Sequence, residues 1–219
     1  MNVRILVVDD ISGANPFSAT KLAVEAEFGG VELIHFNPTE YSDNDKLLSA
    51  VQEQAKQYWD VILVDINLRD DRDEGKQIEL SLTVIERVRT ENSVTALFLF
   101  SGTLVKEIQK AIKSDETTKK KQPEILIKRL LDADIDNFVS RSDLTNAILE
   151  ALRIPSAALQ IDRLLMENAS LVSKCKEGIF DGKSFSDLAC SIRSNDDRGQ
   201  ELLSLIVNYG VASILDLNI

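Results

Sequence analysis

The sequence predicts an α/β protein: a doubly wound, five-stranded parallel sheet followed by a small all-helical region. Short runs of branched apolar residues, without the polar alternation of a half-exposed strand, recur through the first 144 residues. Segments with apolar residues at helical spacing separate these runs. Strands that alternate with helices favour a parallel sheet covered by helices on both faces. Beyond Pro155, only helical periodicity is found.

The expected strands and helices alternate along the chain. Pro16 lies near the first turn of the first helix, and Gly29-Gly30 ends that helix. The expected strands are residues 3–9, 31–36, 61–66, 96–100 and a short segment within 136–143. The helices expected between and after them are residues 17–28, 45–59, 78–89, 104–113, 123–134 and 144–152.

We therefore expect two parts, residues 1–153 and 154–219, with a polar, lysine-containing insertion near 104–122. The second part should contain helices at 156–175, 184–194 and 198–217, the last of them broken near Gly210. A bundle of this size is marginally stable unless it packs on another surface. We interpret it as an output region that binds a protein target or a second copy of the chain.

Charge and hydropathy exclude several classes of function. The formal net charge is -11, and acidic residues outnumber basic ones both before and after residue 144. Non-specific binding to nucleic acid is therefore disfavoured. The apolar runs are too short to span a bilayer, and the N-terminus meets two acids within ten residues, which is not typical of a signal peptide. We expect a cytoplasmic protein without membrane contacts.

Three acids follow two of the buried strands: Asp9 and Asp10 after the first, and Asp65 at the end of the third. Adjacent carboxylates repel each other and are costly to desolvate, so a cation between them is expected. Ligands of wound sheets bind at the carboxyl ends of the strands, where Ser101 and Arg141 are also expected. Oxygen ligands suit Mg²⁺, and a carboxylate can act as a nucleophile towards phosphorus.

With these residues at its strand ends, the sequence resembles the receiver domain of two-component response regulators. The matching pieces are ILVVDD, VILVDI, FLFSG and DNFVSRSD, and the resemblance covers about residues 1–150. It implies a flavodoxin-like domain that takes a phosphoryl group from a histidine kinase or phosphotransfer protein. It further implies these roles: Asp65 as phosphoacceptor; Asp9, Asp10, Asp65 and the backbone carbonyl of Asn67 as Mg²⁺ ligands; Ser101 as switch hydroxyl; Phe138 as switch aromatic; and Arg141 as the basic residue.

Three features depart from the pattern of that family. Arg141 stands where the family usually has lysine, and Ser142 follows it where proline is common. The loop after Asp65 is long and charged, and it lacks the proline of the family. The insertion near 104–122 lies beside the face that usually signals.

The resemblance favours a phosphoacceptor signalling protein of a phosphorelay over a metabolic enzyme. Three alternatives remain open: a degenerate receiver that serves as an unphosphorylated scaffold, a DNA-binding response regulator, and a metal-dependent phosphohydrolase using the same acids. His35, the only histidine, lies in an apolar strand and is expected to be structural.

Overall fold

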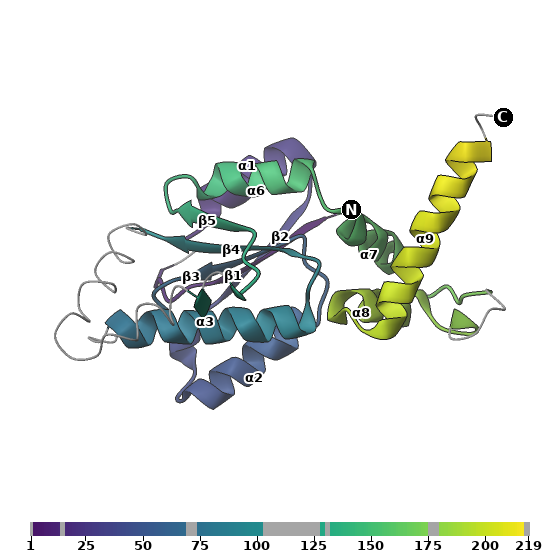
Figure 1. Ribbon diagram of the computed structural model, residues 1–219. Helices are drawn as coiled ribbons and strands as arrows, with labels where there is room; N and C mark the ends of the chain where they lie inside the picture. Colours follow the sequence, from purple (N-terminus) through teal and green to yellow (C-terminus); the bar gives the residue numbers. More distant parts are fainter. Residues whose placement is uncertain are drawn as a thin grey trace. The chain divides into compact units, whose positions relative to one another are not determined.

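Five parallel strands form a single sheet in the order β2-β1-β3-β4-β5, as seen in the computed structural model (Figure 1). The structure describes residues 2–13, 16–68, 74–102, 128–129, 132–174 and 180–216, with only the backbone for 74–77 and 209–216. The strands are β1 Val3–Val8, β2 Val31–Phe36, β3 Val61–Asp65, β4 Ala96–Ser101 and β5 Asn137–Ser140. This order is that of a flavodoxin-like doubly wound sheet, and it confirms the predicted fold class.

Helices cover both faces of the sheet. Helices α1 (Ser18–Phe28) and α6 (Leu144–Arg153) lie on one face, and α2 (Asn44–Ala55) and α3 (Glu74–Glu91) lie on the other (Figure 1). A short 3-10 helix, η1 (Pro38–Glu40), follows β2. The predicted helices at 104–113 and 123–134 and the insertion near 104–122 lie outside the described residues, apart from 128–129 and 132–134.

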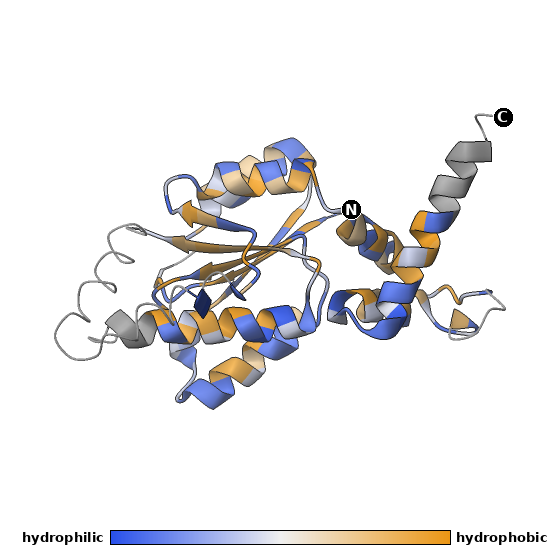
Figure 2. Ribbon diagram, in the orientation of Figure 1, coloured by the Kyte–Doolittle hydropathy of each residue, from blue (hydrophilic) through white to orange (hydrophobic). Residues whose placement is uncertain are grey.

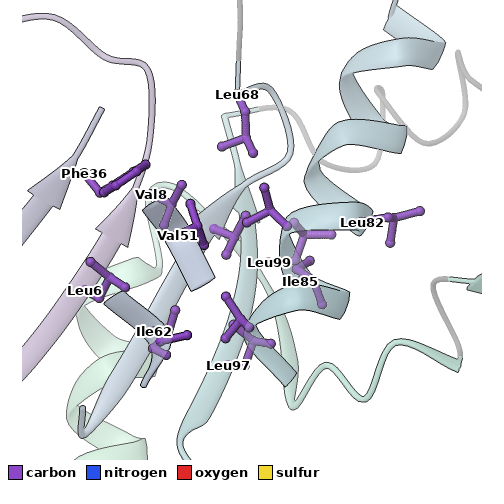
Figure 3. Packing of buried hydrophobic residues seen from close by; sticks show 14 of the residues in the cluster. Leu6, Val8, Phe36, Val51, Ile62, Leu68, Leu82, Ile85, Leu97 and Leu99 are labelled. Atoms are coloured by element: carbon purple, nitrogen blue, oxygen red, sulfur yellow. The ribbon is translucent and has the colours of Figure 1, made fainter. Parts of the chain in front are cut away.

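The central strands carry apolar side chains on both faces, which is why their sequences show no polar alternation. Figure 2 shows apolar residues along these strands and mixed hydropathy on the helices. Figure 3 shows one of the two cores, where side chains from the sheet meet those of α2 and α3. Its labelled residues include Leu6, Val8, Val51, Ile62, Leu82, Ile85, Leu97 and Leu99, and the α1–α6 core includes Ile5, Val7, Val24, Leu63, Phe98, Phe100 and Ile148.

Several helix ends differ from the prediction. Helix α2 ends at Ala55 rather than 59, because the chain turns so that the buried Trp59 can donate its indole N–H to the Gln54 carbonyl, 2.7 Å away. Helix α3 begins four residues earlier than expected, at Glu74. These ends depend on tertiary contacts that helical periodicity does not contain.

The chain divides into two units, residues 1–89 with 95–155, and residues 90–94 with 156–219. The second unit contains α7 (Ala157–Glu167), α8 (Phe185–Ser194) and α9 (Asp197–Asp216). Helix α7 stops well before the predicted end at 175, and Asn168 caps it by donating to the Leu164 carbonyl at 2.9 Å. Helix α9 continues through Gly210, where a break was expected, since one glycine costs a helix only about 1 kcal/mol.

A buried ion pair links α7 to α8 in the helical unit. The Arg193 guanidinium on α8 donates through Nη1 to Asp162 Oδ1 on α7 at 2.7 Å, and both residues are at most 5% exposed. Gly199 allows α8 and α9 to approach closely, because a Cβ there would lie 2.2 Å from the Ser191 carbonyl oxygen. In the described part of the chain, no helix is long and apolar enough to cross a membrane.

Replacing Asp162 with alanine should destabilise the helical unit by ~3–5 kcal/mol, because the buried guanidinium of Arg193 loses its carboxylate. Denaturant unfolding followed by far-UV circular dichroism measures this loss. The matched control is Glu27→Ala, which removes the solvent-exposed pair with Arg153 and should leave the curve nearly unchanged. Superimposable curves for Asp162→Ala and the wild type would show that the Arg193–Asp162 pair does not stabilise the helical unit.

Candidate functional site

The carboxyl ends of β1 and β3 are neighbours in the sheet. Their register pairs Val8 with Val64, so the next residues, Asp9 and Asp65, are brought to adjacent positions at one edge. Asp9 is fully buried and Asp65 is 4% exposed, while Asp10 is half-buried. One ligand oxygen from each of the three acids lies within 4.8 Å of the others. The structure therefore gathers the three predicted acids into one cluster.

Backbone groups orient both buried carboxylates. The Ile11 N–H donates to Asp9 Oδ1 at 2.6 Å, and the Asn67 N–H donates to Asp65 Oδ1 at 3.3 Å. The backbone carbonyl of Asp9 also accepts a hydrogen bond from His35 Nε2 at 2.8 Å. In each carboxylate, Oδ1 therefore accepts from the main chain, and Oδ2 can accept from another group.

Arg141 binds the remaining oxygens of the two buried acids. Its Nη2 donates to Asp9 Oδ2 at 2.7 Å and to Asp65 Oδ2 at 2.6 Å. The backbone N–H of Arg141 donates to the Ser101 carbonyl at 2.8 Å, which continues the β4–β5 ladder beyond β5. The Arg141 side chain is one-third exposed, whereas the two carboxylates that it contacts are buried.

Burial and like charge raise the pKa of Asp65 to about 7, against an ordinary value of 3.8. Desolvation is the largest cause, and the neighbouring Asp9 charge acts in the same direction. The Arg141 guanidinium and the Asn67 N–H oppose the shift because they stabilise the ionised form. Asp65 is thus a carboxyl group whose charge is costly unless a further cation is present.

The donor set fits a hard divalent cation. Mg²⁺ binds oxygens at ~2.0–2.1 Å, so two ligands on opposite sides of one ion are about 4 Å apart. The three carboxylate oxygens, within 4.8 Å of one another, need only a small contraction to reach that spacing. A bound cation would also offset the repulsion that raises the pKa of Asp65.

Of the other predicted site residues, Ser101 and Asn67 lie at the same edge, whereas Phe138 lies within β5 beside Leu99. Ser101 ends β4 and is fully buried, one residue beyond the pair formed by Asp65 and Phe100. Asn67 is half-buried and contacts Asp65 through its N–H; the predicted role of its carbonyl stays a prediction. Phe138 lies on the edge strand β5 and is 40% exposed, and its switch role is likewise not tested.

Two further residues contact this cluster or its backbone, although the sequence did not indicate it. His35 has the structural role expected of it, because its Nε2 donates to the carbonyl of Asp9, which can only accept. Phe100 lies under Arg141, with the guanidinium carbon 5.1 Å from the ring centroid. Position at a strand end was the available signal for both, but only the strand order shows that these ends meet.

No family model and no curated protein matches the chain. Among solved structures, the chain is similar to the response regulator RcsB from Salmonella enterica serovar Typhimurium, solved bound to promoter rprA with phosphomimetic BeF3⁻. That match has 16% identity and a TM-score of 0.38, and it covers 75% of this chain and 76% of RcsB. The response regulator NtrX from Brucella abortus, in complex with ATP, also matches at 16% identity and a TM-score of 0.38. This chain spans 40% of NtrX, and 87% of this chain is covered. The strand order β2-β1-β3-β4-β5 by itself identifies the doubly wound fold.

Asp65→Asn should stabilise the protein in a metal chelator, by ~1–3 kcal/mol at pH 8 and by less at pH 5. The folded-state pKa of Asp65, about 7, is above its unfolded value. Between these two values the native state holds a proton that the unfolded state has lost, so wild-type stability falls as the pH rises towards 7. Denaturant unfolding of both proteins from pH 5 to 8 measures the difference.

Asp43→Asn is the matched control for the pH series. Asp43 caps α2 by accepting from the Lys46 N–H at 2.9 Å, and this bond keeps its pKa below the ordinary value. Its contribution is therefore constant from pH 5 to 8, and asparagine also caps helices well. A difference between Asp65→Asn and wild type that does not change with pH would show that Asp65 is ionised throughout.

Proposed function

We propose that the protein is a receiver-type phosphoacceptor that takes a phosphoryl group onto Asp65 in a Mg²⁺-dependent reaction. The donor would be a histidine kinase or phosphotransfer protein, and the helical unit would pass the signal to a protein target. The observation that carries this proposal is the convergence of three carboxylates and one guanidinium at the carboxyl ends of β1 and β3. This edge is where doubly wound sheets bind their ligands.

The reaction requires an oxygen of Asp65 to attack phosphorus while the bond from phosphorus to the leaving group of the donor breaks. Two features of the chain support this role: the Asn67 N–H orients Asp65, and Arg141 Nη2 donates to its Oδ2. Asp9, Asp10, Asp65 and the Asn67 carbonyl would hold Mg²⁺, which when bound neutralises charge during attack of an anion on an anion. Arg141 could also bind an oxygen of the incoming group.

The product is a phosphoprotein, so each molecule should react once and then lose the group slowly by hydrolysis. A phosphohydrolase using the same acids would instead turn over a small phosphate ester many times. We therefore propose a signalling protein rather than a metabolic enzyme.

Incubation with acetyl phosphate and Mg²⁺ should add one phosphoryl group to the wild type, and Asp65→Asn should remain unmodified. Intact-mass spectrometry measures the modification, and a chelator should abolish it. Asp60→Asn is the matched control, because Asp60 is a buried acid just before the opposite end of β3, where it accepts from the Arg4 N–H. Modification of Asp65→Asn to the wild-type extent would exclude Asp65 as the acceptor.

A second candidate function, an unphosphorylated scaffold, is favoured by the contacts of Arg141 with both buried acids. In that case the guanidinium permanently serves as the counter-ion that Mg²⁺ would otherwise provide. Titration with beryllofluoride and Mg²⁺ separates the two functions. The phosphoacceptor binds saturably and loses binding in Asp65→Asn, whereas the scaffold does not bind at all.

The helical unit supports protein binding better than DNA binding. Arg193 is buried against Asp162, so it is not available to a phosphate backbone. Leu164 on α7 and Val207 on α9 are both more than half exposed, and a protein partner or a second copy of the chain would cover them. A mobility-shift assay on phosphorylated and unmodified protein tests the DNA-binding alternative.

A further inference from the structure

Arg141 is held on two sides by groups of different chemistry. The edge of its guanidinium donates through Nη2 to the two buried carboxylates, at 2.6 and 2.7 Å. Its carbon lies 5.1 Å from the centroid of the Phe100 ring, within the range of a cation–π contact. The carboxylates provide the charge partner, and the ring provides an apolar surface beneath the cation.

The ring of Phe100 is itself fixed by its neighbours. Phe100 is fully buried on β4, and the Phe17 ring meets it edge-on at 6.3 Å between centroids and 88° between planes. Phe17 also meets the ring of His35 at 5.6 Å, and His35 donates to the carbonyl of Asp9. Each of these residues therefore contacts the next one, and Arg141 contacts Asp9 again through its carboxylate. The connected residues are Asp9, His35, Phe17, Phe100 and Arg141.

This geometry suits arginine better than lysine. A guanidinium is planar, so it can lie against an aromatic ring while its edge donates to carboxylates. A lysine ammonium is a compact, strongly hydrated charge that gains less from a ring and needs a larger water shell. The backbone of residue 141 cannot shift easily to compensate, because its N–H is bonded to the Ser101 carbonyl at 2.8 Å.

We propose that Phe100 is a positioning residue that makes this site specific for arginine at position 141. The ring holds the guanidinium in the orientation that reaches both Asp9 and Asp65, and lysine at the same position does not replace it. This inference rests on the proposed function insofar as Arg141 acts on the phosphoryl group; the contact itself is present without any ligand.

The first test examines the ion-free protein and does not depend on phosphorylation. Nuclear magnetic resonance of the Arg141 guanidinium should show a ring-current shift and slow exchange of its protons with water in the wild type. Phe100→Leu should remove the shift and accelerate exchange, whereas Phe98→Leu should preserve both. Phe98 is the matched control because it lies two residues earlier on β4 and packs in the same apolar cluster.

If Phe100→Leu does not fold, Phe17→Leu provides the same test. It removes the edge contact that fixes the Phe100 ring and should weaken the shift of the Arg141 signal. An Arg141 signal that is identical in wild type and in every folded Phe100 or Phe17 variant would overturn the proposal.

The second test is a double-mutant cycle on the affinity for beryllofluoride with Mg²⁺, using Arg141→Lys, Phe100→Leu and the double variant. We expect Arg141→Lys to weaken binding, and Phe100→Leu to weaken it further only when arginine is present. The expected coupling is ~3- to 30-fold, the range of a partly desolvated cation–π contact. Wild-type affinity in Arg141→Lys, or effects that simply multiply in the double variant, would overturn the proposal.

The two tests separate the positioning role of Phe100 from the phosphoacceptor function of Asp65. If the wild type does not bind beryllofluoride, the phosphoacceptor function fails, and the guanidinium signal alone decides whether Phe100 positions Arg141. If the wild type binds and the two substitutions act independently, the phosphoacceptor function stands and the positioning role of Phe100 fails.

Discussion

Two carboxylates buried side by side at the ends of neighbouring strands are the constraint on which the site depends. Asp9 and Asp65 repel each other in a region of low dielectric, and burial raises the pKa of Asp65 to about 7. Arg141 supplies one positive charge between them, but Asp10 adds a third carboxylate to the cluster. The arrangement therefore carries excess negative charge at neutral pH, which a bound cation would offset.

The rest of the sheet keeps these charges together. Strands β1 and β3 have apolar side chains on both faces, and the packed cores on either side leave the two backbones little freedom to separate. Main-chain N–H groups of Ile11 and Asn67 then set the orientation of each carboxylate. The core thus has a chemical consequence, because it holds the acids at a spacing that suits a divalent ion.

Each unit of the chain contains a contact between an arginine and a buried aspartate, but the two arginines differ in exposure. The Arg193–Asp162 pair is closed to solvent and links α7 to α8. The Arg141 side chain, in contrast, is one-third exposed. A buried pair mainly specifies geometry, whereas a cation at an open site can exchange partners with a ligand. The buried Arg193–Asp162 pair suits a structural role. The exposure of Arg141 suits the role proposed for it at the acid cluster.

The sequence by itself determined the fold class, the five strands and the acids at their ends, because apolar runs and the polar residues that follow them are local features. Tertiary structure decided which of those strand ends, and which further residues, lie together. It placed β1 beside β3, brought Arg141 to an acid 132 positions earlier in the chain, and set Phe100 and His35 around the cluster. It also decided where α2 and α7 end and that α9 continues through Gly210. These outcomes depend on contacts between distant residues, and the periodicity of one segment contains no information about its neighbours in space.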